Sequence, residues 1–123
     1  LDFKKIKNKY YAFSNLGKIN TNKECVELIK WVEEQGAGEI MIDNINKDGS
    51  LEGYDLELCS KISKIVNIPV LISGGAGNWE HFVQGFINGK ADAVCTNNIY
   101  HFTEKSIKSS KIYLKNKGIN VRI

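Results

Sequence analysis

Residues 68–77 read Ile-Pro-Val-Leu-Ile-Ser-Gly-Gly-Ala-Gly, and this stretch decides the fold. The apolar run 68–72 carries the chain's only proline, Pro69, near its start, where a missing N–H is tolerated. The glycine-rich segment 73–77 follows at once, and an apolar helical pattern at 79–87 comes next. A strand, a glycine loop and a helix in this order predict one βα unit of a parallel sheet.

The same alternation of strand and helix continues on both sides of this unit. Further short apolar runs predict strands at 1–3, 39–42 and 91–95, the first ending at Asp2. Apolar residues at helical spacing predict helices at 22–35, 54–65 and 105–116. The aromatic run 10–14, followed by Asn15-Leu16-Gly17, predicts a small hairpin or a decorated loop.

Four consecutive βα units fit two architectures, half of a (βα)8 barrel and a small open doubly wound sheet. Four strands cannot close a barrel, so two edge strands would stay unpaired. The start at Leu1, inside an expected strand, favours the half barrel. We therefore expect a TIM-barrel type α/β fold in which residues 1–123 form a single domain or a fragment.

The bulk composition is that of an ordinary globular domain. Of 123 residues, 42% are hydrophobic and 25% charged, and the net charge of +3 is spread along the chain, so nucleic-acid binding is not expected. Three widely spaced cysteines fit a reducing compartment, and no apolar run approaches the roughly 18 residues that span a bilayer. Lys4 and Lys5 follow the first residues at once, so we expect no signal peptide and a cytoplasmic location.

The loops after the expected strands carry the chemistry. Gly74 and Gly75 let the backbone approach a ligand, and their N–H groups can point at an anion. Asn97 and Asn98 follow the next strand, and adjacent strand ends of a barrel frequently share one phosphate. We expect the two loops to converge on a single anion, although a tight turn and a plain helix cap would read the same way.

Other candidate residues are Asp48, Gly49 and Ser50, in the loop that follows strand 39–42. They form either an ordinary polar turn or a further contact to the anion. Asp2, at a strand end on the same face, is a candidate acid–base group or an ordinary surface carboxylate. His81 and His101 lie among aromatic residues and are expected to pack or cap. No His/Cys pair has metal-ligand spacing, so neither a metal nor another cofactor is expected.

A run of motifs in this order resembles the cyclase subunit of imidazole glycerol phosphate synthase. The matching segments are Gly36-Ala37-Gly38-Glu39-Ile40, Lys47-Asp48-Gly49-Ser50, Gly53-Tyr54-Asp55, Ser73-Gly74-Gly75-Ala76-Gly77, Glu80-His81-Phe82, Ala91-Asp92-Ala93, His101-Phe102 and Lys117-Gly118-Ile119-Asn120-Val121-Arg122. The resemblance covers nearly the whole chain. It implies that the chain holds strands five to eight, the C-terminal half of the barrel, to be completed by an N-terminal half barrel or by self-association.

The resemblance also implies a function in histidine biosynthesis. In this family, ammonia from a glutaminase subunit attacks a bisphosphate ribulosyl-formimino carboxamide ribotide, and a cyclase/lyase reaction gives imidazole glycerol phosphate and an aminoimidazole carboxamide ribotide. By matched position, Asp2 resembles the acid–base aspartate of strand five. The positions that match a phosphate site are Asp48, Gly49, Gly75 and Asn98. Glu39 resembles a charged residue at the ammonia-entry mouth.

Three departures from the family pattern keep two alternatives open. Asp43 stands where the family has a threonine, Thr96-Asn97-Asn98 replaces a smaller Ala-Ala-Ser type, and Asn22 replaces a glycine. A carboxylate at position 43 would repel a bisphosphate unless it were paired or protonated. One alternative is a paralogous ammonia-using barrel for amidino modification of surface-glycan sugars, and the other is a non-catalytic half-barrel assembly module.

Overall fold

The computed structural model of the chain describes residues 1–97, 99–100 and 106–123 and contains one sheet flanked by helices. The strands stand in the order β3-β2-β1-β4-β5-β6. Their bounds are β1 Asp2–Ile6, β2 Lys9–Ser14, β3 Ile19–Glu24, β4 Ile40–Asn44, β5 Val70–Ser73 and β6 Ala93–Val94. The helices are α1 Cys25–Glu34, α2 Leu56–Ser63, α3 Trp79–Ile87 and α4 Ile107–Asn116. No helix in the described ranges is long and apolar enough to cross a membrane.

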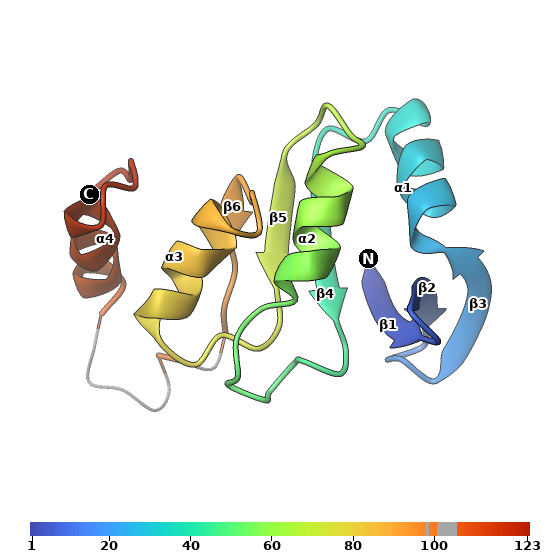
Figure 1. Cartoon of the computed structure of the whole chain (residues 1–123), viewed down its shortest axis with the longest axis horizontal. Helices are drawn as coiled ribbons and strands as arrows, with labels where there is room; N and C mark the ends of the chain where they lie inside the picture. The colour runs from blue at the N-terminus through green and yellow to red at the C-terminus, as the bar shows by residue number, and fades with distance from the viewer. Residues whose placement is uncertain (98, 101–105) are drawn as a thin grey trace.

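The strands β1, β4, β5 and β6 stand side by side in the sheet and pair in parallel. Crossovers between parallel strands are almost always right-handed, so strands added in one direction place their connecting helices on one face. Figure 1 shows α2 and α3 on the same side of the sheet. This alternating, mostly parallel arrangement is that of part of a (βα)8 barrel, which confirms the predicted fold class.

The two faces of the parallel strands differ in burial. Ile40 and Ile42 of β4 are buried under the helices, whereas Met41 between them is 51% exposed. On β5, Val70 and Ile72 are likewise buried, and the residues that alternate with them are only half-buried. Side chains of a strand point alternately to opposite faces, so one face of this sheet is covered by helices and the other is not.

The N-terminal region departs from the prediction. Instead of a stub ending at Asp2, β1 begins at Asp2 and continues to Ile6 as the first strand of an antiparallel pair. The turn residues Lys7 and Asn8 both have positive φ, which is the signature of a type I′ hairpin. The structure thus corrects the placement of Asp2 at a strand's C-terminal end. Asp2 nevertheless pairs with Asp43 near the end of β4, so it lies at the carboxyl edge of the parallel strands.

The helix predicted at 22–35 begins later than expected, at Cys25. Its first expected turn instead belongs to β3, which pairs with β2. Asn22 has φ +58, a value that no α-helix contains. The predicted start at residue 22 is wrong because the helical spacing of apolar residues begins only at Cys25. Residues 22–24 are polar and show no helical periodicity.

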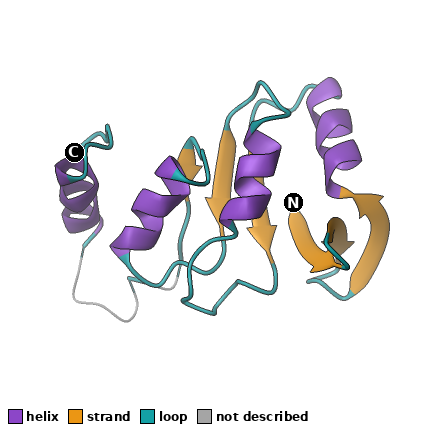
Figure 2. Cartoon of the chain, in the orientation of Figure 1, coloured by secondary structure: helices purple, strands orange, loops and turns teal. Residues whose placement is uncertain are grey.

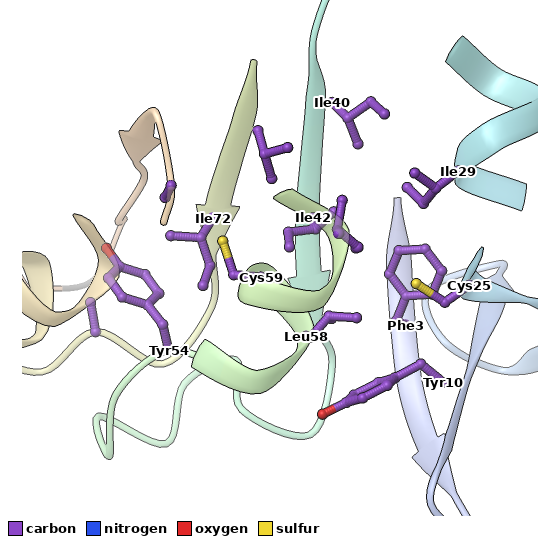
Figure 3. Packing of buried hydrophobic residues seen from close by; sticks show 14 of the residues in the cluster. Phe3, Tyr10, Cys25, Ile29, Ile40, Ile42, Tyr54, Leu58, Cys59 and Ile72 are labelled. Carbon is purple, nitrogen blue, oxygen red and sulfur yellow. The ribbon is translucent and has the colours of Figure 1, made fainter. Parts of the chain in front are cut away.

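One continuous core joins the hairpin to the parallel strands (Figure 3). Phe3 of β1 and Cys25 and Ile29 of α1 are fully buried. On the other side of β4, Leu58 and Cys59 of α2 pack into the same cluster. Fully burying one such aliphatic side chain contributes about 1.5–3 kcal/mol. The same cluster therefore fixes the hairpin and the strand ends relative to one another.

A carboxylate under this core connects three elements. Asp55, the N-cap of α2, accepts a hydrogen bond from the Leu58 N–H at 3.0 Å. The Tyr10 hydroxyl donates to both of its oxygens at 3.0 and 2.9 Å, and Asn44 Nδ2 donates at 2.6 Å. Burial, and then the charge of Asp55, raises the pKa of Tyr10, so this phenol stays protonated and donating. The hairpin, the end of β4 and the start of α2 meet at one side chain.

We expect Asp55→Ala to lower the free energy of unfolding by about 3 kcal/mol, because the helix loses its cap and two polar groups lose their acceptor. Glu57→Ala is the matched control, since its exposed pair with Lys5 at 2.6 Å is worth under about 1 kcal/mol. Urea unfolding followed by circular dichroism measures both. Equal losses in the two variants would contradict a special role for Asp55.

Candidate functional site

The loops that follow β4, β5 and β6 lie along one edge of the sheet (Figure 2). They enclose a pocket of about 250 Å³. Its lining residues are Asp43, Asp48, Gly49, Leu51, Ser73, Gly74, Gly75, Ala76, Cys95, Thr96 and Asn97. The glycine segment after β5 and the polar turn after β6 therefore share one pocket, as the sequence predicts.

Most of the predicted phosphate-binding residues meet in this pocket. Asp48, Gly49, Gly74, Gly75 and Asn97 all line it. That they bind phosphate stays a prediction.

One predicted phosphate-binding residue stands apart from the lining, and two candidate residues fall outside what is described. Ser50 is not a lining residue, and its Oγ accepts the Glu52 N–H at 3.2 Å and so shapes the loop itself. Asn98 and His101 lie outside the described residues.

Gly75 joins two of the loops. Its carbonyl accepts the Gly53 N–H at 2.7 Å, and its φ of +98 is in the region that favours glycine. A Cβ at this position would overlap the carbonyl of Gly53 and touch that of Lys47. The β5 loop can therefore contact the β4 loop only because Gly75 has no side chain.

The pocket contains backbone donors that the protein itself does not use. Among the described residues, no protein group accepts the N–H of Gly49, Gly75, Ala76 or Asn97. Gly75 and Ala76 are successive and buried, whereas Gly49 and Asn97 are exposed. Buried N–H groups are nearly always paired in folded proteins, and successive unpaired ones form concavities that bind anions. The four residues belong to all three loops and line one pocket, so each loop has an N–H donor that is available to an anion.

The start of α3 closes one side of the glycine loop. Asn78 caps the helix by accepting the His81 N–H at 3.0 Å. His81 Nδ1 in turn accepts the Gly77 N–H at 3.0 Å, and its ring lies against Gly53. His81 thus contacts the Gly77 and Gly53 loops, and its packing among the aromatic residues of α3 stays a prediction.

Asp43 is the carboxyl group nearest to the glycine loop. It faces Gly74 so closely that a Cβ there would overlap the carboxyl, and its Oδ1 is buried without a hydrogen-bond partner among the described residues. Burial raises the pKa of Asp43, and the Ser73 hydroxyl, which lowers it, only partly offsets this. The negative charges of Asp48 and Asp2 raise that pKa further.

Asp2 lies next to the pocket and outside its lining. It is exposed, and it pairs in register with Asp43 on one side and with Phe13 of β2 on the other. Its position at the carboxyl edge, within electrostatic range of Asp43, is compatible with the predicted acid–base role, which stays a prediction. Glu39 is exposed and precedes β4, so it lies at the opposite edge, away from the pocket.

Tyr54 is a structural residue of the site that residue patterns did not identify. Its hydroxyl donates to the Cys95 carbonyl at 2.9 Å, which connects the segment before α2 to the end of β6. Burial raises the pKa of Tyr54, so the donor remains protonated. Burial also raises the pKa of the Cys95 thiol, which lines the pocket as a neutral group. The sequence motif Gly53-Tyr54-Asp55 is the signal that could have identified Tyr54.

Comparisons with known proteins agree with this architecture. The sequence model of a family described as "Histidine biosynthesis protein" matches residues 1–106. Relatives from Chlorobium limicola, Chlorobaculum parvum and Chlorobaculum tepidum, each named "Imidazole glycerol phosphate synthase subunit HisF", are 46% identical over 123 residues. Each match covers 100% of this chain and 49% of the relative, so the chain spans about half the length of these curated relatives. With a barrel-type sheet and a family match over residues 1–106, the chain belongs to the histidine biosynthesis protein family.

Proposed function

We propose that this chain forms half of the cyclase subunit of imidazole glycerol phosphate synthase and binds one phosphate of the substrate. The observation that carries the proposal is the pocket lined by three strand-end loops, whose N–H groups include several with no acceptor in the described part of the chain. The name of the 46% identical relatives supports the identity of the reaction. The substrate would be the bisphosphate ribulosyl-formimino carboxamide ribotide, with ammonia supplied by a glutaminase subunit.

The pocket suits a phosphate through its backbone. No lysine or arginine is among its described lining residues, and two carboxyl groups, Asp43 and Asp48, are. Recognition would therefore depend on N–H dipoles of Gly49, Gly75 and Asn97, which lose no side-chain entropy on binding. Asp2, on the same edge, would move protons at the reacting end of the substrate. General acid–base groups contribute about 10²–10⁴-fold to rate.

We further propose that the chain corresponds to strands five to eight and that a complementary half covers its open sheet face. That face carries Met41, which is 51% exposed, and the half-buried Leu71. The strand β6 stands at an edge of the sheet, so a strand of the complementary half could pair with its free side. Glu39, at the opposite edge, would stand at the mouth through which ammonia enters. The three free cysteines fit a reducing cytoplasm.

A second candidate function is favoured by Asp43. A carboxyl group inside the pocket changes the ligand that fits there, as an ammonia-using barrel acting on a surface-glycan sugar would require. Turnover of the ribotide by the assembled barrel decides between the two reactions, and its absence with both halves present favours the sugar enzyme or a non-catalytic assembly module.

Association with a complementary half is expected to depend on the open sheet face. We expect the chain to self-associate alone and to form a one-to-one complex with the other half of the Chlorobium limicola relative, and Met41→Glu to abolish both. Ile87→Glu is the control, because Ile87 is 50% exposed but lies on α3. Light scattering measures the masses. A stable monomer that ignores the complementary half would contradict the proposal.

In that assembled barrel, Asp2→Asn should lower ribotide turnover with ammonium salts by at least about a hundredfold, because the amide cannot exchange a proton. Glu39→Gln, at the opposite edge, should retain turnover with ammonium salts and change only the reaction fed by glutamine. Steady-state rates with each nitrogen source test both. Unchanged turnover of Asp2→Asn would remove Asp2 from the mechanism.

Gly75→Ala is expected to weaken binding of inorganic phosphate at least tenfold, about 1.4 kcal/mol, because its Cβ would separate the loops that form the pocket. Gly38→Ala is the matched control, since a Cβ there meets nothing within 4 Å. Calorimetric titration measures the affinities. Equal affinity in both variants would show that phosphate does not bind between these loops.

A further inference from the structure

Asp43 occupies a position in the anion pocket that is unusual for a carboxylate. It lines the pocket together with Gly75 and Asn97, whose N–H groups have no acceptor among the described residues. Its Oδ1 is buried and has no hydrogen-bond partner within residues 1–97, 99–100 and 106–123, and its carboxyl lies against Gly74. An ionised carboxylate can accept several hydrogen bonds, and a buried carboxylate without donors is destabilised. A carboxylic acid tolerates one unpartnered oxygen better.

The charged surroundings of Asp43 also disfavour a second negative charge. Asp2 on β1 and Asp48 in the β4 loop raise its pKa, while the Leu1 ammonium group and the Ser73 hydroxyl of β5 lower it. Directly after β6, Cys95 lines the same pocket as a neutral thiol. A bound phosphate or sulfate would add negative charge within this group, and a like charge nearby favours protonation of a carboxyl.

We propose that Asp43 binds the anion as a neutral carboxylic acid, donating its proton in a hydrogen bond to an oxygen of the anion. This rests on the proposed function of the pocket and specifies how it tolerates a carboxyl group. The proton comes from solvent and stays on Asp43, so no covalent bond to the anion forms. Hydrogen bonds between an O–H donor and an oxyanion are short and about twice as strong as neutral ones.

The proposal fixes the sign of the pH dependence. The bound state holds one more proton than the free state, so affinity is highest below the pKa of free Asp43. As pH rises above that pKa, affinity falls by up to about tenfold per pH unit until the pKa of the bound state is reached. A threonine at this position would show no such fall, because its hydroxyl donates without titrating.

The test uses sulfate, which does not itself titrate from about pH 5 to about pH 8. Calorimetric titrations of the protein across this range, repeated in buffers of different ionisation enthalpy, give both the affinity and the proton uptake. We expect the natural protein to take up a proton and lose affinity as pH rises. Asp43→Asn, which keeps the shape and an N–H donor, should bind with a flat profile and no proton uptake.

Asp92→Asn is the control carboxyl variant, because Asp92 lies at the amino edge and accepts the Val70 N–H at 2.8 Å. It should keep the profile of the natural protein. Identical flat profiles for the natural protein and Asp43→Asn, or affinity that rises with pH, would overturn the role of Asp43 and leave the anion pocket standing. Absence of sulfate binding in every variant at every pH would overturn the pocket itself as well.

Discussion

The position of the Asp55 carboxylate determines the geometry of the whole carboxyl edge. It receives donors from Tyr10, Asn44 and the first turn of α2, so it sets where β4 stops and where the next helix starts. The loop between these two points therefore has fixed ends. Gly53, near its far end, then reaches the carbonyl of Gly75. The contact between the loops, and hence the pocket, depends on this one capped helix end.

The pocket combines features that usually occur apart. Three loops bring backbone N–H groups to a pocket whose described lining holds the carboxyl groups of Asp43 and Asp48 and no lysine or arginine. Such a site discriminates by geometry and protonation instead of by net charge. The Tyr54 hydroxyl donates to the Cys95 carbonyl and so ties the start of the third loop to the segment before α2.

Local signals were sufficient for some elements and insufficient for others. The helix α3 was predicted with its observed bounds, since Asn78 caps it and apolar spacing runs through to Ile87. The shared pocket followed from the rule that parallel strands end at the same edge. The strand β3 was missed, because its residues are mostly polar and only its pairing with β2 makes it a strand. The contacts of Asp55 join residues 45 and 11 positions apart, which no short pattern encodes.

The hairpin built from β1 and β2 gives Asp2 a backbone unlike that of the other edge residues. Paired strands flank it on both sides, through Phe13 and Asp43, whereas Gly49, Gly75 and Asn97 belong to loops. Its main chain is thus immobilised when the protein folds, before any substrate arrives. A proton-transferring group on such a paired backbone gives up little conformational freedom on reaching a transition state.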